Sequence, residues 1–187
     1  YNGVIIAPGL NLSIKSLVNS ADQIPSFFIK KQKNVVGWRE WLTLPSLGID
    51  AIKAKIDTGA RSSAIHAYSI ETELIEGQEF AIFQVHPMQD DLSNSITCRA
   101  PIVDRRIVRD SGGHEEERLF ISTTVEFMGK HWEAEFSLTN RENMAFRMLL
   151  GRTSLVGGGL IVDPARSFTQ GEELAAKKPT ASKESQL

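Results

Sequence analysis

Apolar and polar residues alternate with a period of two along several segments of the chain. In DAIKAKID, residues 50–57, an apolar residue occupies every second position up to Ile56. HWEAEFSLT, residues 131–139, alternates in the same way from Trp132 to Leu138. Because successive side chains of a strand point to opposite faces, this alternation predicts strands with one buried face.

Other segments add strands and tight turns to this pattern. RLFISTTVEF ends at Phe127, and Met-Gly-Lys at 128–130 joins it to the strand at 131–139 as a predicted hairpin. Residues 79–85 are another strand candidate, and residues 101–121 read as two strands around a Ser-Gly-Gly tip. Only NRENMAFRMLLGRTSL indicates a short helical turn. Many short strands with few helices predict an all-β fold, a small barrel or sandwich.

Composition divides the chain into three parts. Residues 1–35 mix short apolar patches with Gly, Pro and Asn, then the Lys-rich KKQK, which predicts an extension and linker. Residues 36–170 carry the strand pattern and form the predicted domain. Residues 171–187 are small and polar, so we expect a disordered tail.

Charge and cysteine content restrict the function. The 187 residues are 41% hydrophobic with a net charge of −2, which suits a globular domain and argues against nucleic acid as a partner. No apolar run approaches the roughly 20 residues of a membrane span. Cys98 is the single cysteine, which favours a reducing compartment. We expect a cytoplasmic protein, and a removed N-terminal signal or anchor stays open because the sequence begins with Tyr1.

A carboxylate at the end of an apolar strand is the first candidate for chemistry. The strand ends at Asp57, and Thr58 and Gly59 turn the chain sharply. Asp and Gly are also common in ordinary turns, so the tripeptide alone has two explanations. Lys55 lies on the same strand face as Asp57. Lys55 either lowers the pKa of Asp57, acts itself as a proton donor or anion ligand, or is a solvated surface residue.

Three motifs in order resemble the retropepsin-like aspartic proteases. They are Asp-Thr-Gly-Ala at 57–60, the glycine-tipped hairpin, and MLLGR at 148–152. The chain is closer still to a bacterial family that lies beside RimK-type glutamate ligases and was formerly named ATP-dependent zinc protease. The resemblance covers about residues 36–170. It implies a single-lobe retropepsin-like barrel with a flap hairpin and one short helix.

The resemblance also implies a mechanism. Two aspartates share one proton, so that one activates water while the other donates to the scissile carbonyl. The chain has one Asp-Thr-Gly motif, and 187 residues cannot hold two such lobes. We therefore expect a homodimer that pairs Asp57 with its symmetry mate, an aspartic peptidase that needs no cofactor.

The substrate implied by the family is a glutamate-rich peptide, such as the tail that a RimK-type ligase adds to a protein. Typical retropepsins place Asp after Asp-Thr-Gly-Ala, whereas this chain has Arg61. Arginine binds carboxylates through two parallel hydrogen bonds. The alternative is a solvated surface whose charge is offset by Glu115, Glu116 and Glu117 across the hairpin. The candidate substrate-binding residues are Arg61, His66, Arg105, Arg106, Arg109, Ser111, Gly112, Gly113 and His114.

Two other functions compete with the peptidase. One is a binding module that holds an acidic tail without cleaving it. The other is a zinc peptidase, but the histidines and Cys98 are scattered, and HEEER at 114–118 is not His-Glu-x-x-His. A glycine-rich phosphate-binding loop is missing from the sequence, so we expect neither a metal nor ATP.

Overall fold

The computed structural model describes residues 34–89, 92–109, 113 and 115–170, almost all of which belong to β-strands and turns. The helical elements are η1 (Pro45–Leu47) and α2 (Arg152–Gly157). The strands are β1 (Val35–Val36), β2 (Arg39–Leu44), β3 (Ile49–Asp57), β4 (Ser63–His66), β5 (Tyr68–Ile75), β6 (Gln78–Val85), β7 (Ile96–Arg109), β8 (Glu115–Phe127), β9 (Lys130–Thr139), β10 (Met148–Gly151) and β11 (Ile161–Val162).

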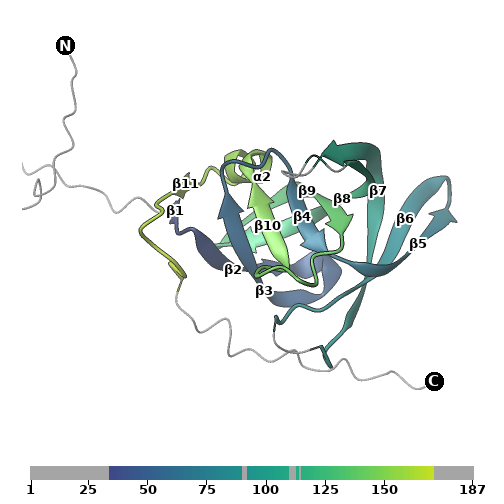
Figure 1. The fold of residues 1–187 in the computed structure, drawn as a ribbon, viewed down its shortest axis with the longest axis horizontal. Coiled ribbons are helices and arrows are strands. Elements are labelled where there is room, and N and C mark those ends of the chain that lie inside the picture. The colour runs from purple at the N-terminus through teal and green to yellow at the C-terminus, as the bar shows by residue number, and fades with distance from the viewer. Residues whose placement is uncertain (1–33, 90–91, 110–112, 114, 171–187) are drawn as a thin grey trace, which may run out of the picture. The chain divides into compact units, whose positions relative to one another are not determined.

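Six strands close into a barrel, in the order β2-β3-β10-β4-β9-β8 and back to β2 (Figure 1). Closure depends on a short contact in which Thr43 of β2 pairs with Glu126 of β8. β10 runs parallel to β3 and antiparallel to β4, so it separates two strands that follow each other in the chain. The all-β prediction, with one short helix, is confirmed.

The buried faces of the strands fill the barrel. Ile52 and Ile56 of β3 are almost fully buried, as are Phe136 of β9 and Leu150 of β10. Burying each such side chain stabilises the fold by about 1.5–3 kcal/mol. The alternation along β3 and β9 therefore reports the barrel interior correctly, because period two is a local property of an extended chain.

β7 belongs to two sheets. Its first half pairs with β6 and its second half with β8, and the register shifts between Ile102 and Asp104. This irregularity bends the strand, so β5 and β6 form a hairpin that projects from the barrel (Figure 1). The second half of β7 and the start of β8 form the predicted flap hairpin; residues 110–112 and 114 of its tip lie outside the described residues.

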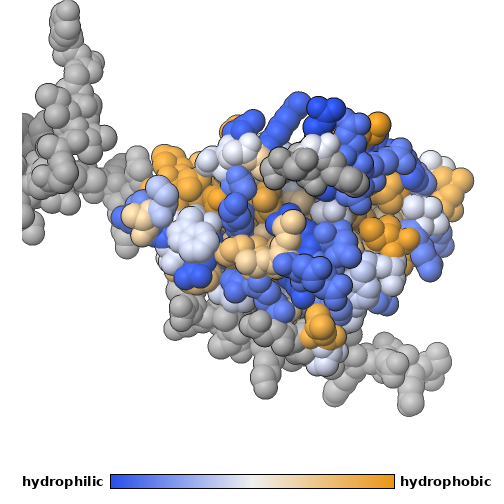
Figure 2. Space-filling view, in the orientation of Figure 1, coloured by the Kyte–Doolittle hydropathy of each residue, from blue (hydrophilic) through white to orange (hydrophobic). Residues whose placement is uncertain are grey.

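The surface is largely hydrophilic over the barrel, with apolar residues exposed at separate places, among them the region of β1 and β11 and the β5–β6 hairpin (Figure 2). Ile161 and Leu74 are examples, with 51% and 72% of their surface exposed. No helix in the described part of the chain is long and apolar enough to cross a membrane.

The predicted boundaries at 35/36 and 170/171 remain predictions. Residues 1–33 and 171–187 lie outside the described residues. Val35, placed in the extension by the sequence, pairs with Ile161 in the two-stranded sheet of β1 and β11.

Candidate active site

The turn that follows β3 crosses over the end of β10. Since β10 lies between β3 and β4, the loop from Asp57 to Ser62 has to pass over Gly151, which pairs with Asp57. A Cβ atom on Gly151 would lie 2.6 Å from the Ser62 carbonyl carbon. The glycine of Leu-Leu-Gly is therefore needed for the close approach of two backbones.

Hydrogen bonds fix the Asp57 carboxylate within this turn. Oδ1 accepts hydrogen bonds from the amides of Gly59 and Ala60, at 3.0 and 3.1 Å. Oδ2 accepts one from Lys55 Nζ at 3.0 Å. About a quarter of the Asp57 side chain is exposed, 23%, so its charge is accessible from solvent. The carboxylate shapes the turn through one oxygen and faces a lysine through the other.

The pKa of Asp57 is lowered by these contacts. Burial alone would raise the pKa, but the hydrogen bond from Lys55, the amides of Ala60 and Gly59, and the lysine charge outweigh it. Asp57 in a single chain is therefore ionised at neutral pH. A second carboxylate brought close to it would raise the pKa of one partner, because two like charges at short distance repel.

Arg152 and Thr153, which the sequence analysis did not single out, tie the turn to α2. Arg152 Nη1 donates to the carbonyl oxygens of Thr58 and Gly59, at 2.9 and 2.8 Å. Thr153 Oγ1 donates to the carbonyl of Arg61 at 3.1 Å. These bonds satisfy carbonyls of the loop and limit its movement. Arginine directly after Leu-Leu-Gly was the available signal.

A serine pair supports the other side of the turn. Ser63 Oγ accepts a hydrogen bond from the Gly151 amide at 3.1 Å and lies 2.9 Å from Ser154 Oγ. Ser63 and Ser154 are buried. The start of β4, the end of β10 and α2 are thereby joined directly beneath the loop that carries Asp57.

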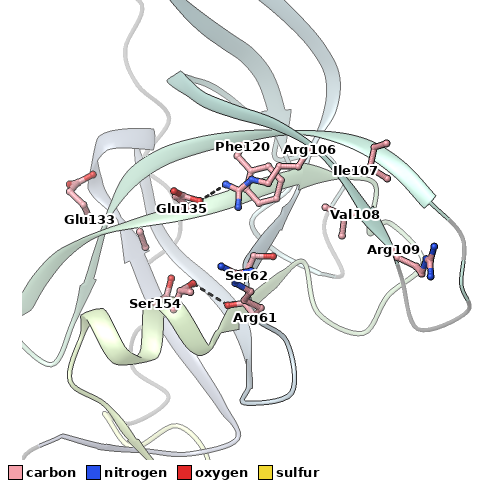
Figure 3. Close-up of a pocket in the computed structure, with 12 residues that line it drawn as sticks. Arg61, Ser62, Arg106, Ile107, Val108, Arg109, Phe120, Glu133, Glu135 and Ser154 are labelled. Carbon is pink, nitrogen blue, oxygen red and sulfur yellow. Dashed lines mark hydrogen bonds and ion pairs between the residues drawn. The ribbon is translucent and has the colours of Figure 1, made fainter.

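A cleft of about 550 Å³ lies between this loop and the flap hairpin (Figure 3). Arg61, Ser62, Thr153 and Ser154 line one side, and Arg106 to Arg109 line the other. Asp57 itself does not line the cleft, which borders the loop four residues further along the chain. The cleft is thus a neighbouring space and not the carboxylate site itself.

The flap arginines are already paired with carboxylates of the same chain. Arg106 Nη2 contacts Glu135 Oε2 at 2.5 Å, and the two side chains point toward each other beside Phe120, on the side of the cleft opposite Arg61 and Ser62 (Figure 3). Arg109 Nε donates to Glu115 at 3.0 Å. Arg105 pairs with Glu79 outside the cleft. Arg61, by contrast, lines the cleft and forms no ion pair with a carboxylate of the described residues.

His66 lies in the protein interior. Its side chain is 1% exposed, and Nδ1 accepts a hydrogen bond from the Arg141 amide at 3.0 Å. Burial lowers the pKa of His66 to about 4, and the charge of Arg147 adds to that effect. His66 is therefore neutral at pH 7 and holds the segment after β9. Of the predicted flap tip, only Gly113 is described; Ser111, Gly112 and His114 lie outside the described residues.

Arg141 is a further cation that the sequence analysis missed. Burial lowers its pKa, the charge of Arg118 lowers it further, and the charge of Asp57 raises it. The charges of Arg141 and Asp57 are therefore close enough to interact, in addition to the direct contact between Lys55 and Asp57. Arg141 follows β9 with no motif around it, so no local pattern could have marked it.

No group of three or more His, Cys, Asp or Glu side chains in the described residues could hold a metal ion. His66 and His86 stack with ring centroids 6.1 Å apart, and Cys98 is buried elsewhere in the core. Burial raises the pKa of the Cys98 thiol to about 12, so it is a protonated core residue.

A closed six-stranded barrel, with an Asp-Thr-Gly turn lying over a Leu-Leu-Gly strand, defines the class of retropepsin-like proteins. The family model "Retropepsin-like aspartic endopeptidase RimB" matches residues 35–173, and the chain belongs to that family.

The curated relatives are longer proteins. A probable alpha-L-glutamate ligase of Desulfotalea psychrophila is 43% identical over 140 residues, which make up 75% of this chain and 30% of the relative. A protein of the same name from Shewanella pealeana is 41% identical over 141 residues, 75% of this chain and 31% of the relative. This chain therefore spans about a third of their length.

A solved structure has the same fold. The Legionella pneumophila protein Lpg0085, of unknown function, superposes with a TM-score of 0.64 at 25% identity. The match covers 74% of this chain and 98% of that one.

Proposed function

We propose that this protein is an aspartic peptidase that works as a homodimer and hydrolyses glutamate-rich peptides. The observation that carries the proposal is the Asp57 turn. A carboxylate held by two backbone amides, at the end of a barrel strand and over a glycine of the neighbouring strand, is a rigid and solvent-accessible base.

The second carboxylate comes from a second copy of the chain. One Asp57 with a lowered pKa activates water but does not donate a proton to the scissile carbonyl at neutral pH. Two copies of Asp57 across a two-fold axis share one proton, and the mutual repulsion keeps that proton bound. Thr58 and Gly59 complete the turn on each side.

The acidic substrate is supported by charge and by the relatives. Lys55 contacts Asp57 directly and Arg141 interacts with its charge, which disfavours a cationic substrate. The matched relatives are named probable alpha-L-glutamate ligases, and a glutamate-removing activity would act on the product of such a ligase.

Substitution of Asp57 tests the mechanism. We expect Asp57→Asn to abolish hydrolysis of an oligoglutamate-tailed peptide and to leave the fold intact, because an amide oxygen can still accept the two turn hydrogen bonds. Asp50→Asn is the matched control, an exposed carboxylate of the same strand. Hydrolysis by Asp57→Asn at the wild-type rate would exclude the aspartic mechanism.

A non-catalytic acidic-peptide module is the second candidate, favoured by the direct ion pair between Lys55 and Asp57. In that case Asp57→Asn would bind the tailed peptide at least as tightly as wild type, and neither protein would cleave it. Activity lost with EDTA and restored by zinc would instead indicate a metallopeptidase.

A further inference from the structure

Six residues form a connected surface on the outward side of β2 and β3, which we call the aromatic–cation face. In register, Trp41 pairs with Lys53, and Arg39 pairs with Lys55. Lys53, Lys55 and Asp57 alternate on one side of β3, so this surface leads directly to the proposed site. Its members are Trp38, Arg39, Trp41, Lys53, Phe146 and Phe168.

Aromatic rings hold the Arg39 guanidinium. Its Cζ atom lies 4.6 Å from the Trp38 ring centroid and 4.7 Å from that of Phe168. Rings that pack over a planar guanidinium leave the N–H donors at its edge for carboxylates. Nε of Arg39 is buried and has no hydrogen-bond partner in the described residues.

Lys53 is held in the same manner. Its Nζ lies 5.7 Å from the Phe146 ring centroid and 6.0 Å from that of Trp41. The rings also contact one another, because Trp38 meets Phe146 edge-on at 5.8 Å. Two cations are thus fixed before a ligand arrives, which lowers the entropy cost of binding.

No carboxylate of the described residues neutralises the charge of this surface. Neither Arg39 nor Lys53 forms an ion pair with a carboxylate of the described residues. The flap arginines Arg105, Arg106 and Arg109 each have one, so a ligand there must displace an internal carboxylate. At Arg39 and Lys53 an acidic ligand meets no such competitor from the part of the chain that the structure describes.

We propose that the aromatic–cation face binds the acidic segment of the substrate and directs it toward Asp57. This inference rests on the proposed function and assigns glutamate recognition to β2 and β3 and not to the flap arginines. The path is short, because the Trp38 carbonyl accepts a hydrogen bond at 2.9 Å from the amide of Ile56, the residue before Asp57.

A peptide suits this surface better than a single-stranded nucleic acid. Nucleic acids bind such platforms by stacking bases on exposed aromatic rings. Here Arg39 covers Trp38 and Phe168, and Lys53 lies over Trp41 and Phe146. The rings are occupied by the protein's own cations, whereas the N–H donors of those cations are available.

The test measures binding in the full chain carrying Asp57→Asn, so that cleavage does not interfere. Hexaglutamate and hexaglutamine peptides are titrated by calorimetry against this protein and against versions with Arg39→Gln or Lys53→Gln added. We expect each added change to weaken hexaglutamate binding about fivefold, the effect of one partly exposed ion pair, and to leave hexaglutamine binding unchanged. Arg99→Gln is the matched control, an arginine over the Phe80 ring that already pairs with Glu73.

Circular dichroism checks the fold of each variant. If Arg39→Gln does not fold, Arg39→Lys replaces it, and we expect an intermediate loss because the charge stays and the planar fork is removed. Hexaglutamate affinity unchanged in the Arg39 and Lys53 variants would overturn the inference.

Two other results would also overturn it. One is decauridylate bound more tightly than hexaglutamate and lost in the same variants, which indicates a nucleic-acid surface. The other is a shift of the Arg39 or Lys53 variant to monomer in sedimentation while its hexaglutamate affinity stays unchanged, which indicates that the surface is an interface between copies of the chain. Failure of the proposed function is distinct, because it appears as wild-type protein that does not cleave the tailed peptide or cleaves it independently of Asp57.

Discussion

At the scale of single residues, the contact between Lys55 and Asp57 sets the chemistry of the turn. The lysine is two positions before the aspartate on the same strand face, and their charged atoms are 3.0 Å apart. The lysine favours the ionised carboxylate and opposes the protonated one. In the proposed dimer this pair therefore decides the pH range in which one proton is shared.

We predict that Lys55→Met shifts the pH profile of kcat/KM to higher pH. Lys55 lowers the pKa of Asp57, so its removal raises that pKa, and the singly protonated pair then persists at higher pH. The measurement is peptide hydrolysis across pH 3–8. The control is Arg99→Gln, which removes a positive charge on β7 and should leave the pH profile of kcat/KM unchanged. A Lys55→Met profile that coincides with that of wild type would contradict the role of Lys55.

We also predict that stability falls with acid because of His66. The pKa of His66 is about 4 in the folded protein, against 6.5 for an unperturbed histidine, so the unfolded chain binds the proton more readily between these values. The contribution of neutral His66 to the unfolding free energy is present in full above pH 6.5 and is lost as the pH falls toward 4. Its size is at most about 3 kcal/mol. Urea denaturation at pH 7 and pH 5 measures the difference.

His66→Asn is the informative variant, since an amide oxygen can accept the hydrogen bond from Arg141 and does not titrate. Its unfolding free energy should be lower than that of wild type at pH 7 and should fall by less between pH 7 and pH 5. His131→Asn, at an exposed histidine, should show the same difference in unfolding free energy between pH 7 and pH 5 as wild type. An equal loss in His66→Asn and wild type would assign the acid sensitivity to other groups.

At the scale of elements, the position of β10 explains the late glycine. β10 enters the barrel between β3 and β4, and the loop that joins those strands lies against its last residue. α2 begins directly after β10, and its first side chains donate to the carbonyls of that loop. One strand and one short helix therefore position the Asp57 turn from below.

We predict that Gly151→Ala disrupts the site. The new Cβ would meet the Ser62 carbonyl carbon at 2.6 Å, so the loop or β10 has to move. We expect a loss of about 1–3 kcal/mol in unfolding free energy, typical of overpacking, with activity reduced further than stability. Gly157→Ala is the control, because its Cβ would meet only the Trp132 side chain at 3.3 Å and should cost less than about 1 kcal/mol.

At the scale of the whole molecule, the proposed active site needs two chains. One barrel presents one Asp-Thr-Gly turn, with the carboxylate partly exposed. A site shared across a two-fold axis makes activity a property of the pair, so a chain without Asp57 inactivates the partner that still has it.

We predict that mixing wild-type protein with the Asp57→Asn variant lowers the rate of hydrolysis by more than the smaller amount of wild-type protein alone would. After subunit exchange, only pairs of wild-type chains are active, so the total rate falls with the square of the wild-type fraction. The measurement is initial rate at constant total protein. A rate that falls in direct proportion to the wild-type fraction would show that each chain acts alone.

The sequence by itself determined the features that depend on near neighbours in the chain. Alternation predicted β3, β8 and β9 because the side-chain period of a strand is local. The shared face of Lys55 and Asp57 followed from their spacing of two, and the glycine-containing turns marked the hairpins. The family motifs indicated the fold and the Asp57 turn by resemblance.

Tertiary structure decided everything that joins distant parts of the chain. Arg152 reaches the Thr58 carbonyl across 94 positions, and Arg106 reaches Glu135 across 29. No local pattern records which carboxylate an arginine meets, because barrel closure sets that distance. The sequence left two interpretations of the flap arginines open, a cradle for an acidic peptide or a surface offset by the glutamates across the hairpin. In the fold Arg109 pairs with one of those glutamates, whereas Arg105 and Arg106 pair with the distant Glu79 and Glu135. Arg39 and Lys53 were not singled out from the sequence, and in the fold they are among the cations that form no ion pair with a carboxylate of the described residues.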